Sequence, residues 1–142
     1  MDTLSPTERS ERMGRVRSKD TKPELTVRRL VHSLGFRYRL HNRELPGTPD
    51  LVFCSRRKII FVHGCFWHRH DPECPLTRLP KSNLEFWLRK LEQNRTRDNK
   101  NIKRLRADGW RVMVVWECEL SNLEALTRRI RPFLERRAFK IG

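Results

Sequence analysis

Residues 58–74 read KIIFVHGCFWHRHDPEC, and this stretch changes character at Gly64. Residues 59–62 are apolar and mostly β-branched, which is typical of a buried strand that the glycine ends. Three histidines, two cysteines and the adjacent aromatic residues Phe66 and Trp67 follow from position 63 onward. A structural loop rarely needs that mixture. The sequence therefore predicts a functional site that begins where a strand ends.

The cysteines and one histidine of this stretch have the spacing of a metal site. Cys65, His70 and Cys74 are arranged as C-x4-H-x3-C, and Cys118 follows a second apolar stretch. Three thiolates and one imidazole form a closed tetrahedral zinc site, so we predict structural Zn²⁺ on these four residues. The alternative is that the cysteines are buried apolar residues and the histidines belong to a solvated loop. Cys54 is left over and is expected to fill a strand.

Phe66 and Trp67 would then lie between zinc ligands, where a short clamped loop can hardly bury both rings. Rings held in this way are suited to stacking on nucleic-acid bases. His63 and His68 are not among these zinc ligands and remain unligated beside the zinc site.

The net charge indicates the kind of partner. The 142 residues include 32 Lys and Arg but 17 Asp and Glu. The resulting formal net charge of +15 is one that a polyanion would neutralise. The sequence has neither an apolar run of roughly 18 residues nor a signal-peptide core, so we expect a cytoplasmic protein that binds DNA or RNA rather than a membrane.

We expect residues 1–20 to be a basic arm along phosphates and residues 21–142 a single domain. Met13 in the arm is either a surface residue or a wedge for a base stack.

Hydrophobic periodicity and turn signals predict an α/β chain in the order αβββαβα. The first helix begins at Thr21, where Thr21 and Glu24 form a capping box, and ends near Gly35. The residues at 82–85 form a second capping box. We expect further helices at 84–108 and 123–134, the last kinked or ended by Pro132, and strands at 36–40, 51–54, 58–63 and 111–116.

Two carboxylates stand at positions that ordinary structure does not explain. Asp98 falls in the middle of the apolar stripe of the 84–108 helix, beside Asn94, so a partner or a catalytic role must compensate its charge. Asp50 lies where a loop meets a buried strand, at the same end of an antiparallel pair as His63. Its ordinary alternative is an Asx turn, and that of Glu24 is the helix cap.

These groups together predict a site for phosphodiester cleavage. Carboxylates hold Mg²⁺, which generates hydroxide and stabilises the leaving oxygen. His68 can transfer a proton near neutral pH, and Asp98 can orient its ring. No glycine-rich phosphate loop and no Ser/His/Asp set is present, so we expect neither an NTPase nor an acyl transferase.

Four stretches carry a resemblance to a known family. LPGTPD at 45–50, VHGCFWH at 62–68, EFWLRKLEQNRTRD at 85–98 and GWRVMVVWECEL at 109–120 resemble the very short patch repair (Vsr) mismatch endonucleases. The resemblance covers roughly residues 8–135. It implies a restriction-endonuclease-like core, αβββαβ with a mixed central sheet flanked by helices. It also implies nicking on the 5′ side of the thymine in T·G mismatches left by deaminated 5-methylcytosine.

The resemblance further implies roles for individual residues and partners. A cytosine-5 DNA methyltransferase is the usual functional companion of such an enzyme, and mismatch-repair or repair-synthesis proteins would process the nick. A monomer suffices for a single-strand nick. The implied roles are Mg²⁺ on Asp50 and the backbone carbonyl of Val62, support through water from Glu24 and His63, acid and base chemistry by His68 and Asp98, zinc on Cys65, His70, Cys74 and Cys118, and DNA intercalation by Phe66, Trp67, Trp87 and Met13.

Two other functions use many of the same residues. A restriction-type endonuclease would cut unmismatched DNA at its own sequence, and only the intercalating residues and the specific motifs favour mismatch repair over it. A zinc-stabilised DNA-binding module without catalysis would share the charge, the aromatics and the zinc, but it leaves Asp50 and Asp98 unexplained.

Overall fold

The computed structural model describes residues 21–70 and 74–136 and confirms the predicted order of elements. Its regular elements form a mixed α/β structure in which three strands are followed by a long helix, a fourth strand and a final helix. Short 3-10 turns at Cys54–Arg56, Pro75–Thr77 and Glu117–Ser121 connect them. The helices and strands are α2 (Lys22–Ser33), β1 (Arg39–Leu40), β2 (Leu51–Phe53), β3 (Lys58–His63), α3 (Leu84–Ala107), β4 (Arg111–Trp116) and α4 (Leu123–Glu135).

The strands form one mixed sheet in the order β1-β2-β3-β4. β1 and β2 pair antiparallel, and so do β2 and β3, which are joined by the short 3-10 turn at Cys54–Arg56. β3 and β4 pair in parallel from Lys58 opposite Arg111 to His63 opposite Trp116. A parallel pair needs a crossover, and α3 provides it. Because β2 pairs with β3 only as far as Ile60, the last residues of β3 extend beyond β2.

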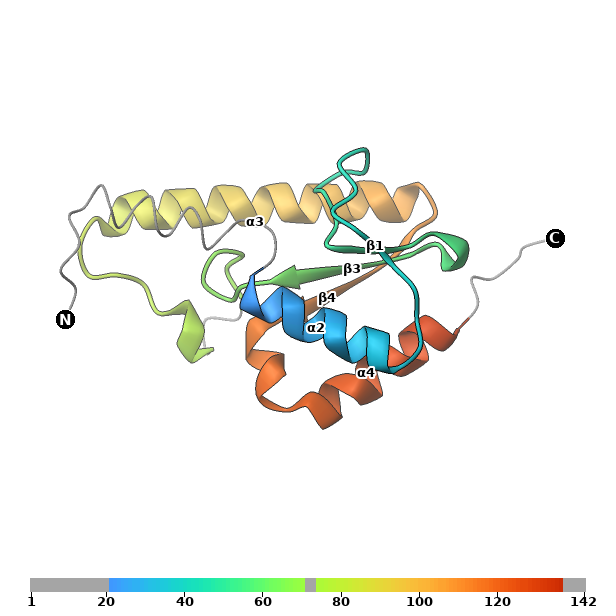
Figure 1. Ribbon diagram of the computed structural model, residues 1–142. Coiled ribbons are helices and arrows are strands. Elements are labelled where there is room, and N and C mark those ends of the chain that lie inside the picture. Colours follow the sequence, from blue (N-terminus) through green and yellow to red (C-terminus); the bar gives the residue numbers. More distant parts are fainter. Residues whose placement is uncertain (1–20, 71–73, 137–142) are drawn as a thin grey trace.

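Helices cover both faces of this sheet, with α3 on one side and α2 and α4 on the other (Figure 1). Alternating side chains of β3 point to the two sides, as the strand period of two requires. Ile60 packs in a core with Val27 of α2 and Ile130 of α4. Ile59 packs on the opposite side in a second core with Leu105 of α3. The ends of β2 and β3 are thereby held between helices at fixed distances.

Both predicted capping boxes are wrong in detail. The Thr21 hydroxyl accepts a hydrogen bond from the Glu24 backbone N–H at 3.4 Å, but the Glu24 side chain bonds to Arg28 and His41 instead of returning to the cap. α3 begins at Asn83, whose backbone is left-handed (φ 56°) and whose side chain makes no capping bond. A buried partner for Glu24 therefore outweighs the local cap.

The sheet edges also differ from the predicted boundaries. Phe36 and Tyr38 are half-buried and alternate with the exposed Arg37, as predicted, but only Arg39–Leu40 pairs with β2. Cys54 was expected in a strand, and this was wrong: it begins a 3-10 turn and is exposed.

Pro132 lies inside α4, which continues to Glu135 rather than ending at the proline. Two cations stabilise the carbonyls that this last turn leaves without N–H partners. The buried Lys58 ammonium donates to the Phe133 and Arg136 carbonyls, and the Arg56 guanidinium donates to the Leu134 carbonyl at 2.8 Å. These long-range contacts hold the turn in place beyond the proline.

Candidate active site and metal centre

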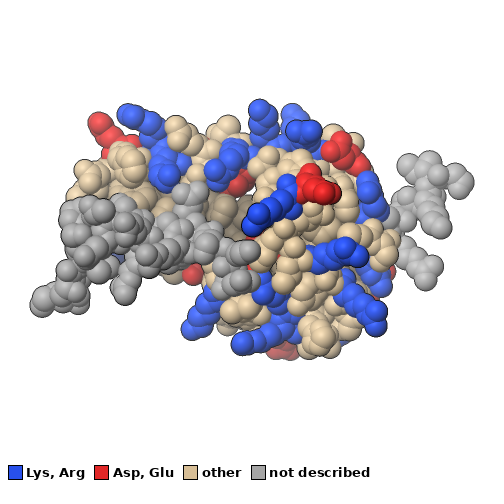
Figure 2. Space-filling model, turned by 45° about the horizontal axis from the view of Figure 1, so that its top comes forward, with Lys and Arg blue, Asp and Glu red and all other residues tan. Residues whose placement is uncertain are grey.

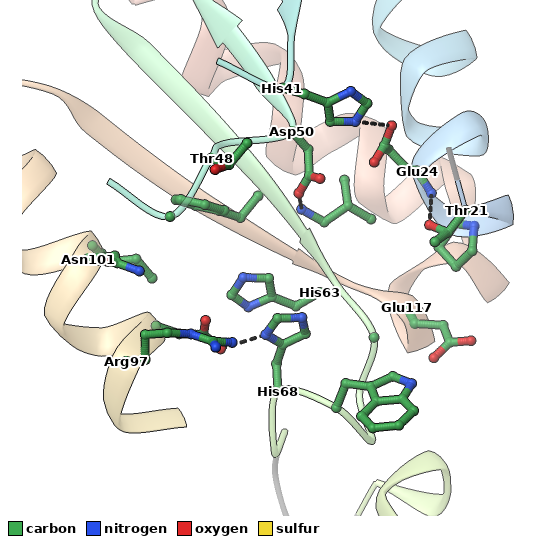
Figure 3. Close-up of a pocket in the computed structure, with 18 of the residues that line it drawn as sticks. Thr21, Glu24, His41, Thr48, Asp50, His63, His68, Arg97, Asn101 and Glu117 are labelled. Atoms are coloured by element: carbon green, nitrogen blue, oxygen red, sulfur yellow. Dashed lines mark hydrogen bonds and ion pairs between the residues drawn. The ribbon is translucent and has the colours of Figure 1, made fainter. Parts of the chain in front are cut away.

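A cleft of about 800 Å³ opens at the end of β3, between the start of α2, the loop before β2 and the middle of α3. Figure 3 shows its polar side chains converging from these separate elements. The predicted residues that line it are Glu24, Asp50, Val62, His63, Phe66, Trp67, His68 and Asp98. The structure therefore brings together residues that the sequence analysis took from five different segments, and Asp50 and His63 share one end of the sheet as expected.

Asp50 precedes β2 and reaches across to the end of β3. Its Oδ2 accepts a hydrogen bond from the Val62 backbone N–H at 2.7 Å, beyond the last residue that β2 pairs (Figure 3). The pKa of Asp50 is raised to about 8: burial is the largest cause, the Val62 hydrogen bond opposes it, and the neighbouring Glu24 carboxyl adds to it. A carboxyl in this state binds a proton that a cation would readily replace.

Glu24 supplies the second carboxylate of this pocket and is only 2% exposed. Its Oε2 receives the Arg28 guanidinium and, at 2.8 Å, Nε2 of His41. Ligand atoms of Glu24, His41 and Asp50 all lie within 4.8 Å of one another. Two carboxylates and an imidazole at this spacing could hold a divalent cation. This group is called the acidic pocket below.

His63 and His68 stack face to face, with ring centroids 3.8 Å apart and planes 8° apart. Nδ1 of His68 lies 2.5 Å from the Asp98 carboxylate, which confirms that the inward acid of α3 has a partner. Because a carboxylate only accepts hydrogen bonds, Nδ1 carries the proton and Nε2 remains basic. Burial, followed by the adjacent His68, lowers the pKa of His63 to about 3, so that ring is neutral.

A second group of ligands lies beyond the end of the sheet. Ligand atoms of Cys65, His70, Cys74 and Cys118 all lie within 4.8 Å of one another, and the Cys118 sulfur is 3.6 Å from Nδ1 of His70. Burial raises the pKa of the Cys65 thiol, and that of the Cys118 thiol is raised for the same reason. A bound cation would reverse this by stabilising the thiolates. We call this group the thiol cluster, and it could hold a metal ion.

Phe66, Trp67 and Trp87 form an aromatic cluster between the loop after β3 and the start of α3. Their ring centroids are 5.1 to 5.9 Å apart, and all three side chains are partly exposed. The Asn94 amide donates to the Trp67 carbonyl at 3.2 Å and ties the loop to α3. Met13, predicted to intercalate, lies outside the described residues.

Two residues of the site were not recognised from the sequence. His41 follows a short strand, where a histidine reads as an ordinary loop residue. Trp116 ends an apolar strand and so reads as core, but its ring stacks on His70 at 4.1 Å and meets His63 edge-on at 5.3 Å. It therefore joins the thiol cluster to the histidine pair.

Basic side chains surround the cleft. In Figure 2, which turns the α3 side forward, Lys and Arg are spread over the visible surface and few acidic side chains interrupt them. Arg97 and Arg43 line the cleft itself. Within the described part of the chain, no helix has the length and apolar character to cross a bilayer. Exposed cations on α3 include Arg89, Arg97, Lys100, Lys103, Arg104 and Arg106, and Lys90 is partly exposed.

Comparison with known proteins identifies a consistent set of relatives. A sequence profile described as DNA mismatch endonuclease Vsr matches residues 1–74. The type II nicking enzyme V.XorIIP of Xanthomonas oryzae pv. oryzae is 56% identical over 134 residues, which cover 94% of this chain and 97% of that protein. The type II nicking enzyme V.NmeAIP of Neisseria meningitidis is 42% identical, with 91% of each chain covered. The DNA mismatch endonuclease Vsr of Escherichia coli is 43% identical over 84% of this chain and 75% of its own length.

Proposed function

Because this chain belongs to the Vsr family and is a DNA endonuclease, we propose that it nicks DNA on the 5′ side of the thymine in T·G mismatches. The observation that carries this proposal is the cleft in which Asp50 faces the His68–Asp98 pair, with the aromatic cluster at its edge. A non-catalytic binding module would need neither the acidic pocket nor an acid-oriented histidine. The proposed origin of the mismatch is deamination of 5-methylcytosine, and the proposed core is restriction-endonuclease-like.

The acidic pocket fits Mg²⁺, which prefers oxygen ligands. The N–H and C=O of one strand residue point to the same edge, so the Val62 carbonyl faces the side on which its N–H meets Asp50. Asp50 and this carbonyl would hold the ion, with Glu24 and His63 supporting it through water. Bound Mg²⁺ would supply charge neutralisation at the phosphate and a more acidic water.

His68 is proposed to transfer the proton. Its Nδ1 is fixed by Asp98 at 2.5 Å, which leaves Nε2 as the basic atom. His63 is buried and neutral, and its stacked ring holds the plane of His68. Asp98 thus orients the imidazole and stabilises its charged form, while His63 positions it.

The aromatic cluster is proposed to insert beside the mismatch. Phe66, Trp67 and Trp87 present partly exposed rings next to the cleft, and stacking on a base is worth about 1–3 kcal/mol. We assign to the basic arm at 1–20 a path along phosphates, with Met13 as a wedge from the opposite groove, and to residues 21–142 the nuclease domain.

The thiol cluster is proposed to bind structural Zn²⁺. Three sulfur ligands and one imidazole nitrogen match the ligand preference and tetrahedral number of zinc. The ion would fasten the loop that carries Phe66, Trp67 and His68. Such a protein would act as a monomer in the bacterial cytoplasm, alongside a cytosine-5 DNA methyltransferase and the proteins that process the nick.

The test is strand-specific mapping of cleavage. Purified protein with Mg²⁺ is incubated with a labelled duplex that carries one T·G pair in a CTWGG-like context, and with the matched T·A duplex. A nick only 5′ of the mismatched thymine supports the proposal. Cutting of both duplexes would instead favour a restriction-type endonuclease, and tight binding without a cut would favour a binding module.

A further inference from the structure

His41 makes contacts that an ordinary loop residue does not need. Its side chain is only 15% exposed, and its Nε2 lies 2.8 Å from Oε2 of Glu24. Figure 3 shows the ring reaching from the strand loop to α2 across the top of the cleft. Of the five histidines in the chain, His63 and His68 face the cleft from below and His70 belongs to the thiol cluster. His41 is the histidine that meets a carboxylate of the acidic pocket.

Two contacts meet on one oxygen of Glu24. The Arg28 guanidinium and His41 both bind Oε2. Since the carboxylate only accepts hydrogen bonds, Nε2 of His41 is the donor, and its 3.4 Å separation from Arg28 is a contact between two donors that share one acceptor. A ligand oxygen of Glu24 lies within 4.8 Å of one of Asp50, so the Glu24 carboxylate lies against the rest of the pocket.

Arg28 and His41 restrain Glu24 in different ways. Arg28 lies one turn further along the same helix and neutralises the carboxylate, but it moves with α2. His41 comes from a separate segment, and its backbone N–H donates to the Asp50 carbonyl at 3.3 Å. The same residue thus contacts Glu24 through its ring and Asp50 through its main chain.

The backbone conformation of His41 directs its ring toward α2. Its φ is +47°, in the left-handed region that histidine, like asparagine and aspartate, adopts more often than most other side chains. Here the left-handed turn comes directly after β1 and turns the chain so that the ring reaches α2.

We propose that His41 is a positioning residue of the acidic pocket, which fixes Glu24 by Oε2 so that Oε1 faces the cation held beside Asp50. The inference deepens the proposed function and rests on its assignment of a divalent cation to this pocket. Without His41, Arg28 still neutralises Glu24, but the carboxylate loses its restraint from the segment after β1. The expected loss is therefore in cation affinity rather than in folding.

The test compares five proteins: wild type, His41→Ala, His41→Gln, Asp50→Ala and the control His32→Ala, which removes an exposed histidine of the last turn of α2. Mn²⁺ binding without DNA is measured by electron paramagnetic resonance, with Asp50→Ala defining the signal of the pocket. Nicking of the T·G duplex is then followed against Mg²⁺ concentration. Zinc content and melting temperature report whether each variant is folded.

We expect His41→Ala to raise the Kd for Mn²⁺ and the Mg²⁺ concentration for half-maximal nicking by about tenfold, the usual loss when a residue that orients a metal ligand is removed. His41→Gln keeps an N–H donor and should stay within about threefold of wild type. His32→Ala should match wild type. Unchanged Mn²⁺ binding in His41→Ala, or equal losses in the Gln and Ala variants, would overturn the inference.

The two proposals fail in distinguishable ways. If wild type binds Mn²⁺ through Asp50 but nicks no T·G duplex, the proposed function is wrong while the Mn²⁺ titration still decides the role of His41. If Asp50→Ala leaves Mn²⁺ binding unchanged, the pocket holds no cation and the His41 inference fails with it.

Discussion

The acidic pocket and the thiol cluster could each hold a metal ion, and they are built in opposite ways. Three of the four thiol-cluster ligands come from one loop, residues 65–74, whereas the acidic pocket joins α2, the loop after β1 and the start of β2. The sulfur atoms of the thiol cluster would close around an ion, whereas the two carboxylates and the imidazole of the acidic pocket line the open cleft. A local, closed group suits a structural metal, and a dispersed, open group suits catalysis.

The largest expected effect separates the two groups by activity. Asp50→Ala removes the carboxylate that meets Val62, and we expect nicking to fall by about 10³-fold or more while zinc content and mismatch binding stay unchanged. Single-turnover cleavage, metal analysis and a gel-shift assay measure the three quantities. Asp108→Ala, at the exposed end of α3, is the matched control. Cleavage at the wild-type rate by Asp50→Ala would remove Asp50 from the mechanism.

The next largest effect distinguishes the thiol cluster from the acidic pocket by its contribution to protein stability. Cys118→Ser removes one thiolate from the thiol cluster, so we expect loss of bound zinc and a decrease in the free energy of unfolding of on the order of 3 kcal/mol. Cys54→Ser changes an exposed thiol outside the cluster and should alter neither quantity. Zinc analysis and denaturant titration provide the readouts. An unchanged zinc stoichiometry in Cys118→Ser would contradict the ligand assignment.

The acidic pocket also predicts a pH dependence of stability. Burial raises the pKa of Asp50 to about 8 in the folded protein, so the folded state binds more protons than the unfolded chain between about pH 4 and 8. The contribution of Asp50 to the free energy of unfolding therefore decreases as pH rises through this range when no divalent cation is added. Below about pH 6.5 the lowered pKa of His63 opposes this trend, so the decrease is expected between about pH 6.5 and 8. Asp50→Asn carries no charge and should be more stable than wild type at pH 8, by on the order of 2 kcal/mol.

The measurement is denaturant unfolding of both proteins between pH 6 and 8.5. Added Mg²⁺ should stabilise wild type at pH 8 and leave Asp50→Asn unchanged, because binding of the ion requires the charge of the Asp50 carboxylate. A stability difference that is constant across this pH range would show that Asp50 does not titrate as described.

The smallest expected effect concerns Trp67, which lies between two residues of the thiol cluster in the sequence. Trp67→Ala should reduce the preference for a T·G over a T·A duplex by about tenfold, because stacking reads the shape of the mismatch while the cations supply general affinity. Trp67→Phe keeps an aromatic face and should lose less. Binding constants for the two duplexes give the ratio. Equal losses on both would show that Trp67 contributes affinity without discrimination.

The sequence predicted the parts of the site that follow from local periodicity. Asp98 could be placed inward because a helix repeats every 3.6 residues, and the end of β3 could be placed because its apolar run stops at Gly64. The thiol cluster was predicted by spacing, since three of its ligands share one loop.

Contacts between distant segments could not be predicted in the same way. His41 meets Glu24 across 17 positions of sequence, and a capping box is the simpler interpretation when only local neighbours are visible. The buried Lys58 similarly stabilises the end of α4 beyond Pro132, a contact that no local pattern indicates. The pairing of β1 is short for a related reason, because strand length depends on the partner strand as well as on alternation.

The most direct test of the division between the two groups is single-turnover nicking of the T·G duplex by protein of measured metal content, with and without added Mg²⁺. The account predicts about one tightly bound zinc per chain, no nicking until Mg²⁺ is added, and the same zinc content after turnover. Nicking at the full rate without added Mg²⁺, or Mg²⁺-dependent nicking by fully active protein that holds no zinc, would contradict it.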